Sequence, residues 1–258
     1  MWRWGALIWL AVLIVGVEHA YAQPPRIAIV IDDVGYRWRE DSRAMALPQQ
    51  VAVAVIPDSP HGSEMASLAS TQQREVLLHL SMQALGDSTR HASHAHLHLT
   101  TADTTSKTIR TVLDEALQRI PTASGVSNHR GSALTQQREA MRRLMQELAR
   151  SRELYFLDSY TTADSIALSE AWRANIPATR RDVFLDHDRS PTAIEYQIER
   201  LIRIARHRGQ ALAIGHPWPE TLTQIERLLP RLAAEGIELV SPATLMRVGS
   251  VRPDASAD

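Results

Sequence analysis

The sequence predicts an α/β protein whose fold is a distorted (β/α) barrel of about seven parallel strands in a single domain. Short apolar segments alternate with longer amphipathic segments of helical period, which favours a parallel sheet. The apolar segments hardly alternate in polarity, as expected for strands that are buried on both faces. The chain has 258 residues and no visible internal repeat, which suits one sizeable core. A doubly wound open sheet remains the alternative.

Seven segments have the composition of buried strands. They are short, rich in Val, Ile and Leu, and several are followed by Pro, Gly or Asp. The predicted strands are residues 26–31, 51–56, 75–80, 154–157, 183–185, 211–214 and 237–240.

Four longer segments place their apolar residues on one stripe of a helix. They are residues 104–120, 134–150, 190–209 and 221–235. In the third, Ser190 and Pro191 are typical of a helix start and Gly209 of a helix end.

Residues 1–22 have the pattern of a secretory signal peptide. Arg3 precedes an apolar run that is shorter than the roughly 20 residues of a membrane-spanning helix, and Ala20 and Ala22 form a small-x-small cleavage site. We therefore predict cleavage after Ala22, a periplasmic protein, and no stable membrane insertion; an uncleaved anchor is the alternative. The domain is predicted over 23–247, and the polar residues 248–258 are predicted to be a disordered tail.

Charge and cysteine content narrow the possible classes of partner. The formal net charge is −1, so nothing in the balance favours nucleic acid or an anionic membrane surface. The chain has no cysteine, so an exported domain must be held by packing without disulfides.

Acids and histidines follow nearly every predicted strand. The carboxyl ends of parallel strands meet at one rim, where the reactive groups of such folds gather. One Asp with two His suits zinc or a similar divalent cation, a second Asp can act as a base, and a further His can protonate a leaving group. The residues in these positions are Asp32, Asp33, His79, Asn128, His129, Asp158, Asp186, His187, Asp188 and His216.

Each of these residues also has an ordinary structural interpretation. An Asp after a strand is often a helix cap or a turn former, which applies to Asp182, Asp186 and Asp188. A single His in an apolar run, such as His79, is often a hydrogen-bonded core residue. The stretch that holds His91, His94, His96 and His98 is interpreted as a solvated loop, with a surface metal cluster as the alternative.

Six motifs together resemble the divergent polysaccharide deacetylase family, in order and spacing from about residue 26 to residue 246. The resemblance implies a distorted barrel of the carbohydrate-esterase deacetylase type. The motifs are IVIDDVG (29–35), VAVAVIP (51–57), EVLLHLSM (75–82), GVSNHRGS (125–132), FLDSYTT (156–162) and AIGHPWPETL (213–222).

The resemblance also implies roles for individual residues. Asp32 would be the general base, His216 the general acid, and Asp158 the acid that orients His216. Asp33, His79 and His129 would hold a divalent metal, with zinc as the expected ion. The activity implied is removal of acetyl groups from an envelope glycan such as peptidoglycan by metal-activated water.

Two motifs of the wider deacetylase group are absent. No second histidine follows His79 in the sequence Leu80-Ser81-Met82-Gln83, and Asn128-His129-Arg130-Gly131-Ser132 stands where an Arg-x-Pro-Tyr motif is usual. A non-catalytic periplasmic protein that binds a glycan or a protein is therefore the second hypothesis. A glycoside hydrolase that uses Asp158 and Asp186 as paired carboxylates is the third.

Overall fold

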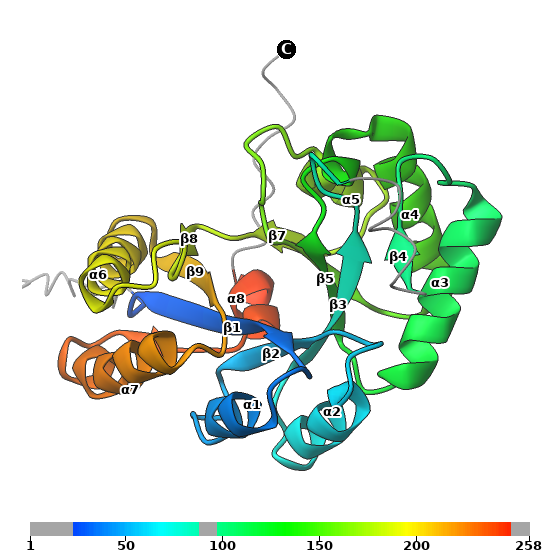
Figure 1. The fold of residues 1–258 in the computed structure, drawn as a ribbon. Coiled ribbons are helices and arrows are strands. Elements are labelled where there is room, and N and C mark those ends of the chain that lie inside the picture. The colour runs from blue at the N-terminus through cyan, green and yellow to red at the C-terminus, as the bar shows by residue number, and fades with distance from the viewer. Residues whose placement is uncertain (1–22, 88–96, 249–258) are drawn as a thin grey trace, which may run out of the picture.

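The computed structural model describes residues 23–87 and 97–248. Its strands form one ten-stranded sheet in which every pairing is parallel (Figure 1). The main path runs β7 (Ala178–Arg180), β6 (Tyr155–Asp158), β5 (Gly125–Arg130), β3 (Val76–Met82), β2 (Ala52–Val55), β1 (Arg26–Val34), β9 (Gln210–Gly215) and β8 (Val183–Phe184). Two short strands lie off this path: β10 (Glu238–Leu239) pairs with β1, and β4 (His98–Leu99) pairs with β3.

The two ends of the strand path lie close together at a seam. Strands β7 and β8 are at opposite ends of the path, yet only Arg181 and Asp182 separate them in sequence. The backbone N–H of Arg181 donates to the carbonyl of Asp158 at the end of β6, and that of Asp182 donates to the carbonyl of Leu212 in β9. The sheet is therefore curled into an incompletely closed barrel, which confirms the predicted α/β class and distorted barrel.

The helices follow the strands, and all but α8 cover the outside of the sheet (Figure 1). The first four are α1 (Trp38–Met45), α2 (Gly62–Thr71), α3 (Ser106–Arg119) and α4 (Arg138–Ser151). The others are α5 (Ala167–Arg173), α6 (Pro191–Arg208), α7 (Pro219–Ala234) and α8 (Pro242–Val248), and a 3₁₀ turn spans Leu134–Gln136. Within the described residues, no helix is both long enough and apolar enough to cross a bilayer.

Helix α6 shows how local sequence sets the boundaries of an element. The side chain of Ser190 accepts a hydrogen bond from the N–H of Ala193, Pro191 occupies the first turn, and Gly209 ends the helix in the left-handed conformation with φ of 79°. This confirms the predicted start and end.

Two hydrophobic clusters hold the layers together. The larger one lies between the outer face of the sheet and the helices. The smaller one lies among inward-facing residues such as Val30, Leu77 and Leu212, and α8 contributes Leu245 to it. Helix α8 thus closes the amino-terminal end of the barrel and leaves the carboxyl end for the site.

Several elements of the structure were not predicted from the sequence. Residues 125–130 form strand β5 although polar residues interrupt its pattern, because the buried Ser127 and Asn128 find hydrogen-bond partners on neighbouring elements. Strand β7 and helices α1, α2, α5 and α8 were not predicted, since none exceeds ten residues. Helix α8 extends to residue 248, which was expected in the tail. The predicted signal peptide and residues 249–258 lie outside the described residues.

Candidate metal centre and active site

The carboxyl ends of the strands surround a cavity of about 350 Å³. Five of the six sequence-predicted site residues line it; Asp158 does not. The cavity is lined by Asp32, Asp33, His79, Asn128, His129, Arg130, Ser159, Thr161, Arg181, Phe184, His187, Ile214 and His216.

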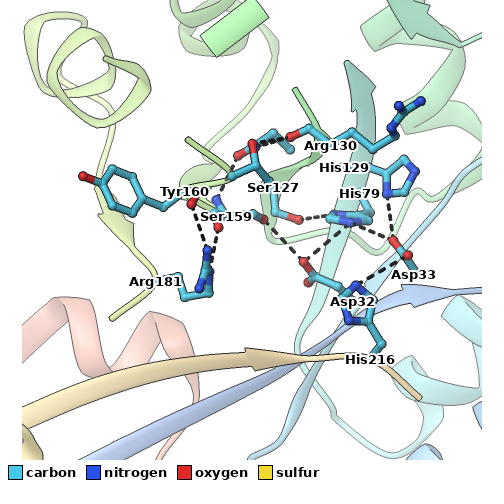
Figure 2. Close-up of polar contacts among 12 residues, drawn as sticks. Asp32, Asp33, His79, Ser127, His129, Arg130, Ser159, Tyr160, Arg181 and His216 are labelled. Carbon is cyan, nitrogen blue, oxygen red and sulfur yellow. Dashed lines mark hydrogen bonds and ion pairs between the residues drawn. The ribbon is translucent and has the colours of Figure 1, made fainter. Parts of the chain in front are cut away.

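A bulge at the end of β1 directs two adjacent carboxylates to the same site. Between Ile31 and Val34 the register of β1 against β2 shifts, and Asp33 takes a left-handed φ of 58°. Side chains of successive strand residues normally point to opposite faces, but the bulge breaks this alternation. As a result, Nε2 of His79 lies 3.5 Å from Oδ2 of Asp32 and 3.2 Å from Oδ1 of Asp33 (Figure 2).

Asp33, His79 and His129 form the one cluster in the described chain whose donor atoms suit a metal ion. One ligand atom from each lies within 4.8 Å of the others. Oδ1 of Asp33 is 2.8 Å from Nδ1 of His129 and 3.2 Å from Nε2 of His79, yet this buried oxygen has no hydrogen bond of proper geometry. Donor atoms that converge without bonding to one another fit a shared cation, and the set of two imidazoles and a carboxylate suits zinc.

Electrostatics and the surrounding contacts agree with a ligand role for these residues. Burial raises the pKa of Asp33, but the imidazoles of His129 and His79 lower it by more than burial raises it. The carboxylate therefore stays ionised. Nδ1 of His79 lies 2.7 Å from Oγ of Ser127, and a proton on Nδ1 leaves Nε2 with its lone pair toward the site. The His79 and His129 rings pack edge to face at 5.1 Å.

Asp32 has the environment of a base rather than a ligand. Its Oδ2 accepts a hydrogen bond of 3.4 Å from Oγ of Ser159, and its buried Oδ1 has no partner within the described chain. Burial raises the pKa of Asp32, and the nearby His79 only partly offsets this effect. A more basic carboxylate with one unbonded oxygen therefore belongs to a residue that lines the cavity.

His216 is oriented by Asp186, which corrects the sequence-based expectation that Asp158 has this role. Nδ1 of His216 lies 2.9 Å from Oδ1 of Asp186, and Oδ2 of Asp186 accepts the His216 backbone N–H at 2.6 Å. Although burial lowers the pKa of His216, Asp186 and Asp33 raise it to about 9. The ring therefore carries a proton at neutral pH, and its Nε2 lies 3.6 Å from Oδ2 of Asp33.

The carboxylate of Asp158 is hydrogen-bonded within a turn beneath the rim. It accepts the backbone N–H of Tyr160 at 2.8 Å and the hydroxyl of Ser165 at 2.7 Å. Because Asp158 and Asp186 are both engaged by local donors, neither is free to act as one of the paired carboxylates of a glycoside hydrolase.

Two residues that matter for the site were not assigned their roles from the sequence. Arg181 comes from the seam between β7 and β8, where it donates from Nε to the carbonyl of Ser159 and from Nη2 to that of Tyr160, at 2.7 and 2.8 Å (Figure 2). Asp186 resembled a turn former. Asp186 follows a predicted strand, but many acidic residues do so, and this position alone does not distinguish it.

Backbone strain is concentrated at the same rim. Five non-glycine residues of the described chain have positive φ, and three of them, Asp33, Arg130 and Tyr160, stand at the carboxyl ends of β1, β5 and β6. Such conformations cost free energy and persist where the surrounding structure requires them, often at functional sites.

The aromatic residues at the rim differ in availability. Trp218 is already in contact with the guanidinium carbons of Arg37 and Arg189, 3.6 and 4.0 Å from its ring centroid. Tyr36 and Trp38 are about half exposed, at 54% and 52%. Among the loop histidines, only His98 is described; it lies in β4, and the other three lie outside the described residues.

Comparisons with known proteins agree with this picture of the fold. Residues 29–246 match the family described as divergent polysaccharide deacetylase. The chain is 36% identical over 221 residues to the uncharacterized protein YibQ of Escherichia coli K12, covering 86% of this chain and 67% of that protein.

Solved structures share the fold at lower identity. An uncharacterized protein from Agrobacterium tumefaciens C58 has a TM-score of 0.81 at 24% identity, covering 88% of this chain and 91% of that one. The peptidoglycan deacetylase PdaC of Bacillus subtilis (a D285S mutant) has a TM-score of 0.52 at 12% identity, covering 88% and 92%. A CE4 family pseudoenzyme from Bacillus anthracis has a TM-score of 0.53 at 13% identity, covering 88% and 66%.

Proposed function

The chain belongs to the divergent polysaccharide deacetylase family, and from this premise we propose that it is an exported, metal-dependent hydrolase that removes acetyl groups from an envelope glycan. One observation carries the proposal. The three candidate metal ligands, Asp33, His79 and His129, converge beside Asp32 and His216. Oδ1 of Asp32 has no hydrogen-bond partner in the described chain, and Asp186 keeps the imidazole of His216 protonated.

The metal proposed for the cluster is zinc. Asp33 Oδ1, His79 Nε2 and His129 Nδ1 would hold it, and all three residues line the cavity. A divalent cation there lowers the pKa of water and polarises a carbonyl oxygen.

Asp32 and His216 supply the proton transfers of the proposed reaction. Oδ1 of Asp32 accepts a proton from the attacking water, which its raised pKa favours. Nε2 of His216 donates its proton to the leaving amine nitrogen as the C–N bond breaks, so that acetate and a free amine are released. For an ester, the same proton goes to the leaving oxygen.

The proposed substrate and location rest on the family and on the N-terminus. A related fold is named as a peptidoglycan deacetylase, and the cavity has room for an acetylated sugar unit. Residues 1–22 carry the signal-peptide pattern, which supports a periplasmic location.

A non-catalytic envelope protein that keeps the fold and the metal is the second candidate. It is favoured by the absence of a second histidine after His79 and by the pseudoenzyme among the proteins of similar fold. The unpaired Asp32 Oδ1 favours catalysis, because a protein that only binds gains nothing from a buried carboxylate with a raised pKa.

Metal content and acetate release decide between the two. Elemental analysis of the purified protein is expected to give near-stoichiometric zinc, lost in His79→Ala and His129→Ala and kept in His207→Ala, whose histidine is exposed on α6. The zinc-loaded protein is then expected to release acetate from acetylated peptidoglycan. Zinc without acetate release from any acetylated glycan would support the binding protein, and no metal at all would contradict both.

A further inference from the structure

Two arginines line the catalytic cavity, and they differ in how their charge is balanced. Arg130 forms an ion pair with Asp87 at 2.5 Å. Arg181 has no carboxylate within 4.0 Å among residues 23–87 and 97–248. Asp32, Asp158 and Asp186 offset the charge of Arg181 only from beyond that distance.

The guanidinium of Arg181 is held in a fixed orientation. Two backbone carbonyls accept from Nε and Nη2, and the group stacks on the ring of Phe184 with 4.5 Å between the guanidinium carbon and the ring centroid. Phe184 in turn packs edge to face on the ring of His216 at 5.4 Å. The plane of the guanidinium is thus fixed relative to the proton donor of the proposed reaction.

The hydrogen-bonding capacity of Arg181 is only partly used. No acceptor in the described part of the chain bonds to Nη1. Asp32, Asp158 and Asp186, whose charges act on Arg181 at longer range, do not bond to its guanidinium. Nη1 is therefore available on a side chain that lines the cavity.

We propose that the acetylated sugar bound in this cavity carries a carboxylate and that Nη1 of Arg181 receives it. This inference rests on the proposed function and specifies its substrate class, an acidic acetylated sugar. A fixed, planar guanidinium is well matched to a carboxylate, whereas a neutral sugar offers Nη1 no charged acceptor. Arg37, which contacts Trp218 two residues beyond His216, adds positive charge at the rim for an anionic chain, whereas Arg189 is paired with Glu220.

Two sugars that differ by one acidic substituent test the inference by binding alone, without any turnover. N-acetylmuramic acid is N-acetylglucosamine with a lactyl ether that carries a carboxylate, so calorimetric titration of the full chain with each compares binding with and without this group. We expect the unsubstituted protein to bind the acidic sugar about tenfold more tightly or better, with a preference that weakens at high salt. Arg181→Gln is expected to abolish the preference, and Arg181→Lys to keep part of it.

The neighbouring Arg180 provides the matched control. It is exposed, lies over the ring of Tyr160 and does not line the cavity, so Arg180→Gln is expected to keep the full preference. Equal affinity of the unsubstituted protein for both sugars, or no binding of either, would overturn the inference without any variant. So would a preference that survives in a folded Arg181→Gln protein. Acetate release is a separate assay, so a protein that prefers the acidic sugar but releases no acetate would refute only the proposed function.

Discussion

The two ends of the barrel satisfy their buried polar groups to very different degrees. At the carboxyl end, six buried polar atoms in the described chain lack a hydrogen-bond partner, and all belong to residues in, or bonded to, the segments around that rim. They are on Asp32, Asp33, Asp41, Asp58, His98 and Glu220.

At the amino end, charged side chains have hydrogen-bond partners within the described chain. Arg74, which is 4% exposed, donates to the backbone carbonyls of four residues in the α1–β2 connection and to the side chain of Gln72. Glu75 accepts hydrogen bonds from the hydroxyl of Tyr155 and from the N–H of Ala243 at the start of α8.

This difference separates stability from function within one fold. Each hydrogen bond at the amino end satisfies a group that would otherwise be buried without a partner, which stabilises the closed barrel. At the carboxyl end, the oxygens of Asp32 and Asp33 that lack a hydrogen bond cost free energy in the folded protein, and both residues line the cavity where a metal, water or substrate would bind. Substitutions at the two ends should therefore have opposite effects on stability and activity.

Asp32→Asn is expected to have the largest effect on activity while increasing stability. Removal of the base should lower acetate release about 10²- to 10⁴-fold. Because the pKa of Asp32 is raised in the folded protein, its ionised carboxylate opposes folding above that pKa, and the neutral amide removes this cost. Acetate release and thermal unfolding at pH 7 measure both effects.

The exposed Asp114→Asn, on α3, is the control and should change neither quantity. A less stable Asp32→Asn protein would mean that this carboxylate holds the barrel together, which would contradict the distinction between the two ends.

Arg74→Met is expected to show the reverse pattern. The variant keeps an apolar stem but removes the donor of the buried hydrogen bonds to the carbonyls of Met45, Leu47 and Val51, so the free energy of unfolding should fall by about 3 kcal/mol. The rate per folded molecule should not change, because Arg74 does not line the catalytic cavity. Urea unfolding measures the loss, and Arg119→Met, on the exposed surface of α3, is the control. A loss below about 0.5 kcal/mol, the usual range for surface sites, would contradict this prediction.

Asp186→Asn should have a smaller effect on activity, and it tests whether Asp186 is the partner that raises the pKa of His216. Loss of the carboxylate should move the pKa of His216 from about 9 toward 6.5, measured by NMR titration of the metal-free protein. The stability gained from the raised pKa is fully present below pH 6.5 and is lost as pH rises through about 9, so this dependence should disappear. Acetate release should fall roughly one hundredfold, with its alkaline limb at lower pH.

Asp158→Asn distinguishes the carboxylate that the structure selects from the one expected from sequence. It should leave the pKa of His216 near 9, because the carboxylate of Asp158 bonds to Tyr160 and Ser165 instead. Equal pKa shifts in the two variants would show that His216 responds to the general charge of the rim and not to a direct partner.

Much of the fold could be predicted because its signals are local. The β1 and β9 strands are continuous apolar runs, and α6 has its cap, its apolar stripe and its terminal glycine in adjacent residues. Strand β5 could not be predicted in this way, because its buried Ser127 and Asn128 become acceptable only when distant partners satisfy them.

The sequence by itself determined the α/β class, the alternation of elements and the rim at which Asp32, Asp33, His79, His129 and His216 would gather, because parallel strands present their carboxyl ends together. Only the tertiary structure decided how these residues are used. The β1 bulge turns both aspartates inward, the curl of the sheet brings Arg181 to the cavity, and the pairing of β8 with β9 sets Asp186 against His216. These contacts join residues far apart in the chain, and no local pattern encodes such distances.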